Sequence, residues 1–456
     1  MNYQNLPLKT VCIEVKNSPR PFHAALQSVG HGGINTRPLP ERVVQGLRKL
    51  RVPRIRTFIQ EYFNVYPEHG VFDFSLLDPY LESLHRTGAD IVAALSIKPP
   101  VLFPRIDETV VMPNDPEEWK TVVKALVHRY SIERPYITHW EIGNEVDIGE
   151  IGGCPYRMAD GKAYFDFYRL TAEAVLEAFP AAKVGGPGLS NSYSEILPEF
   201  VRCCAENGTR LDFISWHTYN NDFSSVREQI RRTRDLLTGY YGADRPRILV
   251  TEYGPAFDRI SLPEQAFSGY RVVNVAGLLL TAEEEQLDES YYYHVWDQVF
   301  YDSEFASFFA DPYIMQKHWN EVPHRFGMFS VDEQVRPAYF VYRLFRELGS
   351  DRLTVTKNPD HIWLCPVRRQ DGSVSVMVVN GSEEDEAVEL RFSGLSAGEV
   401  WIENYRLGDE KRWDEETLEL IPVEKRTSYV WENYNCHLYS PAQTVSVLRI
   451  VKKAVS

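Results

Sequence analysis

Cysteine is scarce in this sequence, which has 6 cysteines among 456 residues. They are scattered along the chain, and the one close pair, Cys203 and Cys204, is vicinal. This spacing gives neither a disulfide framework nor a Cys-x-x-Cys zinc site, so we expect reduced, buried thiols. A His-Glu-x-x-His motif and a glycine-rich phosphate loop are also missing, so we expect no metal and no cofactor.

Basic residues are too few for a protein that neutralises phosphates. Lysine and arginine total 49 against 64 aspartates and glutamates, which gives a formal net charge of −15 at pH 7. This balance argues against nucleic acid or an anionic membrane surface as a partner. The sequence has no membrane-spanning apolar run, and its N-terminus has no basic stretch followed by an apolar segment. We therefore expect a cytoplasmic protein, unless a signal peptide has been removed.

The overall composition is that of a globular protein. Hydrophobic residues make up 44% of the chain and charged residues 25%, which excludes the disordered and coiled-coil classes. With 456 residues, the chain is long enough for one large α/β domain and a smaller companion. Aromatic residues reach 13%, which suits stacking on sugar rings but suits core packing equally well.

Short β-branched or aromatic runs alternate with amphipathic stretches through the first three quarters of the sequence. Eight of these runs predict strands, at 23–30, 53–58, 90–97, 137–144, 183–188, 213–220, 247–254 and 290–297. Eight strands that alternate with helices are the number that closes an α/β fold into a (β/α)8 TIM barrel. An open doubly wound sheet is the alternative, but no Gly-x-Gly-x-x-Gly motif follows the first strand.

After about residue 350 the pattern changes to short alternating strands separated by turn residues. This pattern predicts an accessory antiparallel β-sandwich. The run at 9–15 precedes the barrel and has no helix partner, so we expect it to join the sandwich as an extra strand. The predicted domains are therefore a barrel over 17–349 and a sandwich made of 1–16 plus 350–456.

Two carboxylates stand at predicted strand ends. Glu145 ends the fourth strand, in HWEIGNEVD, and Glu252 ends the seventh, in ILVTEYG. The active site of a (β/α)8 barrel lies at the C-terminal ends of its strands, so both side chains should point into one central mouth. Glycoside hydrolysis needs such a pair, with one carboxyl protonated and the other ionised. We therefore expect both to be catalytic, rather than helix caps or partners of arginines.

The sequence around these two residues resembles the clan A glycoside hydrolases. WEIGNEVD resembles the Asn-Glu signature on their fourth strand, and LVTEYG resembles their seventh-strand motif. DFISWHTYN, SVGHGGINTRPL, RIRTF and RPAYFVYRLFREL are most similar to glycoside hydrolase family 39, the family of β-xylosidases and α-L-iduronidases. The chain departs from that family in having Gly-Asn-Glu-Val where Trp-Asn-Glu-Pro is usual, and Phe58 where a histidine is common.

The resemblance implies a retaining, double-displacement mechanism and roles for individual residues. Glu145 would be the acid/base and Glu252 the nucleophile. Asn144 would hydrogen-bond the 2-hydroxyl group of the sugar in the transition state. Hydrogen bonds from Tyr219 or the charge of Arg56 would keep the nucleophile ionised.

Further residues near strand ends are candidates for contacts with the sugar. His217 could orient the nucleophile or bind a sugar hydroxyl, and His31 is similar, although a lone histidine in a strand is otherwise a core residue. Trp296 could form the apolar floor on which a sugar ring stacks, or could simply pack in the barrel. Glu141, deeper in the fourth strand, is expected to support Arg56.

The predicted function is that of a retaining glycoside hydrolase acting on oligosaccharides or glycosides, with a β-xyloside as the first candidate substrate. Arabinosides, galactosides, glucosides and uronides stay open. One alternative is a catalytically inactive barrel that binds carbohydrate, although the presence of both glutamates argues against it. Another is an aldolase or a metal-dependent hydrolase, for which only Lys98 is suitably placed. The expected partner is a carbohydrate; a homo-oligomer and glycan binding by the sandwich are left open.

Overall fold

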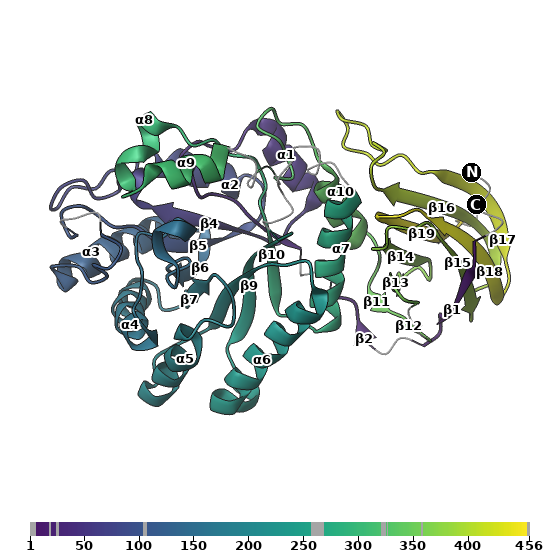
Figure 1. The fold of residues 1–456 in the computed structure, drawn as a ribbon, viewed down its shortest axis with the longest axis horizontal. Helices are drawn as coiled ribbons and strands as arrows, with labels where there is room; N and C mark the ends of the chain where they lie inside the picture. The colour runs from purple at the N-terminus through teal and green to yellow at the C-terminus, as the bar shows by residue number, and fades with distance from the viewer. Residues whose placement is uncertain are drawn as a thin grey trace. The chain divides into compact units, whose positions relative to one another are not determined.

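The computed structural model describes residues 6–17, 20–23, 27–103, 107–256, 269–320, 325, 327–356 and 359–453. The chain forms two compact units (Figure 1). The first unit comprises Leu26–Phe257 and Leu287–Glu333, and the second comprises Met1–Ala25, Asp258–Gln286 and Gln334–Ser456. Among the helices that can be described, none is long and apolar enough to cross a membrane.

The first unit contains a closed barrel of parallel strands, in which β10 pairs with β3 to complete the ring. The eight strands are β3 Ser28–Gly30, β4 Arg54–Gln60, β5 Asp90–Ser96, β6 Ile137–Ile142, β7 Lys183–Leu189, β8 Phe213–Tyr219, β9 Arg247–Gly254 and β10 Glu289–Tyr293. Each coincides with a predicted strand. The predicted fold, a (β/α)8 TIM barrel in the α/β class with an accessory sandwich, is confirmed.

A helix follows each of the first six barrel strands within the same unit. These helices are α1 Glu41–Leu50, α2 Leu77–His85, α3 Pro116–Val127, α4 Gly161–Ala178, α5 Ile196–Asn207 and α6 Phe223–Tyr241. Asp115 caps α3 by accepting hydrogen bonds from two backbone N–H groups of the first turn, and Pro116 stands at the first helical position. Asp160 and Asp222 cap α4 and α6, each accepting a hydrogen bond from one backbone N–H group of the first turn. Aspartate before the first turn and proline at the first helical position are both favourable at helix starts.

The barrel interior is filled at the N-terminal ends of its strands. Val92, Phe213, Leu249 and Tyr291 form one buried cluster. All four belong to the first three residues of β5, β8, β9 or β10. Because apolar side chains occupy this end, open space in the barrel can lie only toward the C-terminal ends of the strands.

The second unit contains a sandwich of two sheets. One sheet has the order β12-β1-β15-β18 and the other β17-β16-β19-β14-β13-β11-β2. Their bounds are β1 Leu8–Glu14, β2 Arg20–Pro21, β11 Asp351–Arg352, β12 Thr354–Val355, β13 Ile362–Arg368, β14 Val374–Asn380, β15 Glu386–Ser393, β16 Gly398–Leu407, β17 Glu424–Val430, β18 Asn433–Ser440 and β19 Thr444–Lys452. Strand β1 joins the sandwich as predicted, but it pairs in parallel with β15, so this sheet is not wholly antiparallel. Strands β17 and β18 are both rich in polar residues.

Two helices that follow barrel strands in the chain belong to the second unit. Helix α7 (Gly269–Glu284) follows β9 and packs against β14 and β19. Helix α10 (Pro337–Arg346) follows β10 and packs against α7. The predicted boundaries, with the barrel over 17–349 and the sandwich over 1–16 plus 350–456, stay a prediction. The boundaries of the two compact units differ from the predicted boundaries chiefly because α7 and α10 belong to the second unit.

Some strand ends differ from the predicted ones. Strand β6 ends at Ile142 because Gly143 takes a φ of 93°, which is outside the β region, so Glu145 lies in the loop that follows. Strand β10 ends at Tyr293, so Trp296 lies beyond it. Strand β3 has only three residues, and residues 24–26 of the predicted first strand lie outside the described residues.

Candidate active site

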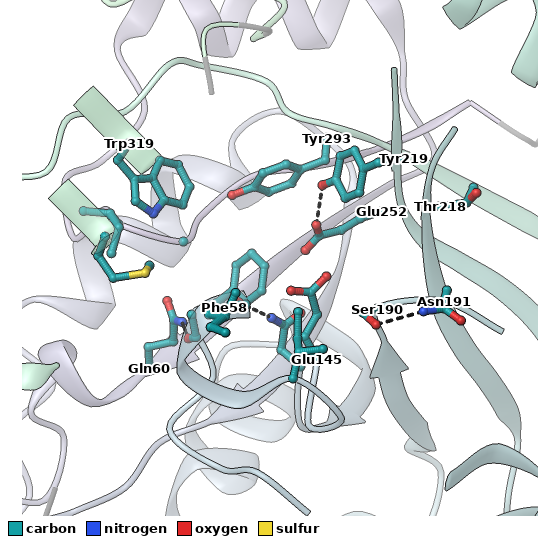
Figure 2. Close-up of a pocket in the computed structure, with 18 of the residues that line it drawn as sticks. Phe58, Gln60, Glu145, Ser190, Asn191, Thr218, Tyr219, Glu252, Tyr293 and Trp319 are labelled. Carbon is teal, nitrogen blue, oxygen red and sulfur yellow. Dashed lines mark hydrogen bonds between the residues drawn. The ribbon is translucent and has the colours of Figure 1, made fainter. Parts of the chain in front are cut away.

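A cavity of about 390 Å³ opens at the C-terminal ends of the barrel strands (Figure 2). Every barrel strand except β5, or the segment after it, contributes a residue to its walls. Figure 2 shows Glu145 and Glu252 pointing toward each other across this space. The cavity therefore lies where the sequence predicts it, at the C-terminal ends of the strands. Its two carboxylates point into one space, as expected.

The turn after β6 directs Glu145 into the cavity. Gly143 has a φ of 93° and Glu145 itself a φ of 44°. Because left-handed backbone is unfavourable for a residue with a side chain, neighbouring groups must hold this conformation. The Glu145 N–H donates to the carbonyl of Gly188 at 2.7 Å, and Asn144 Oδ1 accepts from Arg56 Nη2 at 2.7 Å. These two bonds fix the turn on both sides.

Gly152 leaves the space that the Glu145 carboxyl occupies. It ends the short 3-10 helix Gly149–Gly152, which lies in the same loop as Glu145. A Cβ placed on Gly152 would meet Glu145 Oε2 at 2.1 Å and Glu145 Cβ at 2.7 Å. Both distances are far below van der Waals contact, so any side chain at this position must displace the carboxyl or the loop.

Glu252 is positioned by a β-bulge in β9. The register between β8 and β9 shifts just before His217 pairs with Glu252, and Thr251 is the extra residue. Bulges re-aim side chains, which otherwise alternate between the two faces of a strand. Here Thr251 Oγ1 donates to Glu141 Oε1 at 2.9 Å, while Glu252 lines the cavity. Two successive residues of β9 thus join one polar cluster.

Arg56 on β4 connects this cluster. Its side chain is fully buried, and it donates from Nε to Glu141 at 2.7 Å, from Nη1 to Glu252 at 2.6 Å and from Nη2 to Asn144 at 2.7 Å. The ring of Phe58 lies 4.3 Å from the guanidinium carbon. One cation therefore compensates two buried carboxylates and also fixes the orientation of the Asn144 amide.

The two cavity glutamates have different electrostatic surroundings. Burial raises the pKa of Glu145 well above its ordinary value, and the negative charges of Glu252 and Asp147 raise it further. Burial also raises the pKa of Glu252, but the charge of Arg56 and hydrogen bonds from Tyr219, at 2.5 Å, and from Arg56 oppose this rise. Glu145 is therefore the better placed of the two to hold a proton, and Glu252 the better placed to be ionised.

His217 lies between the two carboxyls. Its Nδ1 is 2.9 Å from Glu145 Oε1 and 3.6 Å from Glu252 Oε2. The ring is fully buried, and burial together with the charge of Arg56 lowers the pKa of His217 well below its ordinary value. A neutral imidazole therefore contacts Glu145 at hydrogen-bond distance, whereas the expected partner of His217 was Glu252 or a sugar hydroxyl.

The separation of the two carboxyls bears on stereochemistry. One oxygen of Glu145, one oxygen of Glu252 and one ring nitrogen of His217 all lie within 4.8 Å of one another. Retaining glycosidases hold their carboxyls about 5 to 5.5 Å apart and inverting ones about 6.5 to 9.5 Å. The short separation favours the retaining arrangement. The same three residues are spaced closely enough to ligate a metal ion, but the guanidinium of Arg56 already compensates the charge of Glu252.

Two residues that the sequence proposed for sugar binding lie away from the cavity walls. His31 is fully buried, its Nε2 lies 3.3 Å from Asn35 Nδ2, and burial lowers its pKa to about 3. Trp296 forms a β-bridge with Phe329, and its Nε1 donates to the carbonyl of Val331 at 3.4 Å. Trp296 therefore does not supply the floor of this cavity, because the chain has turned away after the end of β10.

Several cavity residues were not predicted as binding residues. Figure 2 shows Phe58, Tyr293 and Trp319 on one side of the cavity, with Gln60 nearby. Gln60 Nε2 donates to the carbonyl of Gly153 at 3.0 Å. Trp319 belongs to α9 (Pro312–Asn320), in the long segment between β10 and α10. A tryptophan so far from any strand end carries no signal in the sequence that would mark it.

Comparisons with known proteins agree with this architecture. A β-xylosidase from Geobacillus stearothermophilus is 23% identical over 295 residues, which cover 59% of this chain and 53% of that protein. A β-xylosidase from Caldicellulosiruptor saccharolyticus is 24% identical over 163 residues, covering 34% of this chain and 32% of that protein. The chain therefore spans about half the length of the first relative and a third of the second.

A solved structure extends the likeness to the whole chain. The crystal structure of a monomeric β-xylosidase from Caulobacter crescentus has a TM-score of 0.77 at 17% identity, covering 98% of this chain and all of that one. At this identity the likeness shows the fold alone. The sequence model described as glycosyl hydrolases family 39 matches residues 45–384, well over half of the chain. The chain thus belongs to glycosyl hydrolases family 39.

Proposed function

We propose that this protein is a retaining glycoside hydrolase that acts by double displacement, with a β-xyloside as substrate. The observation that carries the proposal is the pair of glutamates, close together in one cavity but in unlike electrostatic surroundings. Membership of the family, and relatives named as β-xylosidases, support the same reaction class and glycone. The carbohydrate would occupy the cavity at the mouth of the barrel.

In the first half of the reaction, Glu252 would attack the anomeric carbon while Glu145 donates a proton to the departing oxygen. Arg56 and Tyr219 hold Glu252 through a hydrogen bond to each of its carboxylate oxygens, which fixes it for attack. Asn144 Oδ1 accepts from Arg56, and its Nδ2 donates to the carbonyl of Gly152 at 3.3 Å, so the second N–H of the amide could bind the 2-hydroxyl. The product of this half is a glycosyl ester on Glu252.

In the second half, water would break the ester. Once Glu252 is esterified it carries no charge, so one of the causes that raise the pKa of Glu145 disappears. Glu145 then becomes more acidic, which suits a general base that takes the proton of the attacking water. His217, held at 2.9 Å from Glu145 Oε1, would fix the carboxyl in both halves.

The walls of the cavity favour a neutral glycone. Of the described residues that line it, none is a lysine or an arginine, and Phe58 and Trp319 offer aromatic surface. A uronide would bring a third carboxylate beside Glu145 and Glu252, with no facing cation among these residues. We therefore place xylosides, arabinosides, glucosides and galactosides ahead of uronides, with the β-xyloside first because of the relatives.

Release of nitrophenol from a panel of aryl glycosides tests the proposal. The panel should hold β-xyloside, α-L-arabinoside, β-glucoside, β-galactoside and a uronide. We expect the largest kcat/KM on the β-xyloside and the smallest on the uronide. If every glycoside is inert while calorimetry detects xylose binding, the barrel is a binding protein and the proposal is wrong.

Glu145→Ala is expected to separate substrates by their leaving groups. On p-nitrophenyl xyloside, whose leaving group is basic enough to gain from a proton as it departs, kcat/KM should fall about 10²- to 10⁴-fold. On 2,4-dinitrophenyl xyloside, whose leaving group needs little protonation, the fall should be much smaller, and azide should give a β-xylosyl azide from the glycosyl-enzyme. An equal loss on both substrates would contradict the acid/base role.

The pH profile of kcat/KM should show the raised pKa of Glu145 directly. Glu145 acts in its protonated form, so activity should persist above the ordinary titration range of glutamate and fall as the pH rises through its raised pKa. In Glu145→Gln this alkaline limb should disappear, because glutamine does not titrate. An unchanged alkaline limb in the variant would assign it to another group.

Gly152→Ala is expected to impair Glu145 without removing it. The added methyl group needs the space of the Glu145 carboxyl, and a displacement of about 1 Å in a reacting group costs about 10²-fold in rate. We expect a loss of this order in kcat/KM on p-nitrophenyl xyloside. Gly239→Ala on α6 is the matched control, because a Cβ there would meet nothing within 4 Å. Equal activity of both variants would show that the loop absorbs the methyl group.

The cytoplasmic location stays a prediction. Whether the protein forms a homo-oligomer stays open. The solution mass of the purified protein, measured by sedimentation, would show whether it is a monomer or a homo-oligomer.

A further inference from the structure

The sandwich exposes large aromatic side chains on one face of its larger sheet. Trp401 on β16, Tyr429 on β17 and Trp431 after it are 38%, 48% and 64% exposed. In the β16–β17 pairing, Trp401 lies opposite Thr427, and Glu399 lies opposite Tyr429. Directly opposed residues share a face and alternate residues return to it, so Trp401 and Tyr429 lie on the same side. Val400, Ile402 and Val430, which alternate with these residues along the two strands, belong to the sandwich core, so the side that carries Trp401 and Tyr429 is the outer one.

Tyr429 and Trp431 form a corner of two rings. Their centroids lie 4.6 Å apart and their planes are inclined by 55°. Trp401 differs from them, because the ammonium groups of Lys425 and Lys453 lie 5.5 Å and 4.9 Å from the centre of its ring. The exposed aromatic surface of this face is therefore concentrated at the corner made by Tyr429 and Trp431.

Charged side chains border this corner in balanced pairs. Glu399, which lies opposite Tyr429, binds Lys453 at 3.2 Å. Glu403 and Lys425, four residues further along the strand pair on the same face, bind each other at 2.8 Å. Glu432, the residue after Trp431, binds Lys16 at 2.7 Å. The rim therefore offers hydrogen-bonding groups without net charge. Such a rim suits a neutral, hydroxyl-rich ligand better than an anionic polymer or a charged peptide.

We propose that the Tyr429–Trp431 corner binds a neutral, soluble polysaccharide chain, with the CH face of one sugar ring on the indole and its edge against the phenol. Apolar ring faces pack on aromatic side chains, while the paired charges at the rim can hydrogen-bond the hydroxyl groups. Two rings inclined by 55° do not offer the flat platform that a crystalline polymer surface needs. The proposal goes beyond the proposed function, because it concerns attachment to a polymer rather than cleavage.

A second copy of this chain is the rival occupant of the face. A stable interface buries about 800 Å² on each partner. A fully exposed aromatic side chain offers about 150–250 Å², and the exposed parts of Tyr429 and Trp431 are 48% and 64%. The corner is therefore much smaller than a stable protein interface needs, but it is large enough for one or two sugar rings.

Electrophoresis through native gels that contain soluble arabinoxylan tests the proposal. The full chain carrying Glu252→Gln, which should not degrade the polymer, serves as the parent. We expect retardation of the parent and a roughly tenfold weaker apparent affinity after Trp431→Ala. Trp431→Phe, which keeps a flat ring, should retain most of the retardation. Tyr240→Ala on α6, which removes a 45% exposed tyrosine of the barrel unit, should migrate like the parent.

Three results would overturn the proposal. A parent that is not retarded binds no such chain, and a Trp431→Ala variant retarded as strongly as the parent binds it elsewhere, for example in the catalytic cavity. A concentration-dependent dimer in sedimentation that Trp431→Ala abolishes would assign the face to a second copy. None of these measurements needs turnover, so they are independent of whether the activity panel succeeds.

Discussion

Glu252→Ala is expected to abolish hydrolysis of p-nitrophenyl β-xyloside, with kcat lower by at least about 10⁴-fold. Glu252 is the carboxylate that Arg56 and Tyr219 hold and orient, so its loss removes the attacking group while the cavity stays in place. Added azide should enter the vacated space and restore turnover. Because azide attacks once, from the side that Glu252 occupied, the product should be the α-xylosyl azide, the opposite anomer to that expected from Glu145→Ala.

Glu206→Ala is the matched control for this variant. Glu206 also pairs with an arginine, Arg202 at 2.9 Å, but on the exposed surface of α5. Surface ion pairs contribute little to stability, so the activity and stability of Glu206→Ala should match those of the wild type. A Glu252→Ala variant that keeps wild-type turnover, or that yields the β-azide, would show that another residue is the nucleophile.

Arg56→Leu is expected to be among the most destabilising single changes in the barrel. It removes the cation from Glu141 and Glu252, whose side chains are 0% and 8% exposed. Breaking a buried ion pair by removing one partner typically costs about 3–5 kcal/mol, because the remaining charge is left without compensation. A marked fall in the thermal unfolding midpoint should follow, whereas Arg48→Leu on the surface of α1 should change it little.

The same variant should change the pH dependence of activity. Arg56 lowers the pKa of Glu252 by charge and by a hydrogen bond, so its loss lets burial raise that pKa further. The nucleophile is active when ionised, so the acid limb of kcat/KM should move to higher pH. Arg56→Lys keeps the charge but not the three-way hydrogen bonding, so its shift and its destabilisation should be intermediate. An acid limb that does not move in Arg56→Leu would contradict this account.

Sequence patterns predicted the strands because buried parallel strands are short and apolar and are separated by amphipathic helices. The same regularity placed Glu145 and Glu252 at the mouth of the barrel, because barrel geometry brings all strand ends together. The support of Arg56 by Glu141, and the contact of Tyr219 with Glu252, also match the observed bonds. Such contacts depend on which side of a strand each residue faces, and the two-residue alternation of the sequence predicts that side.

The features that were missed depend on loops and on departures from regular geometry. The position of Glu145 depends on left-handed backbone at Gly143 and at Glu145 itself, which a strand pattern does not contain. The assignment of a sugar platform to Trp296 assumed that β10 continues to residue 297, but it ends at Tyr293. Trp319 reaches the cavity from α9, and only the path of a long connecting segment decides where it lies.

The order of strands around the barrel makes catalysis a late event in folding. Strands β6 and β9, which carry or precede the two carboxylates, are not neighbours, since β7 and β8 lie between them. The pair forms only when these four strands are in register, so it depends on contacts distant in the sequence, which form slowly. During refolding, helical signal should therefore return before turnover, and the first turnover should mark the moment when these four strands have come into register.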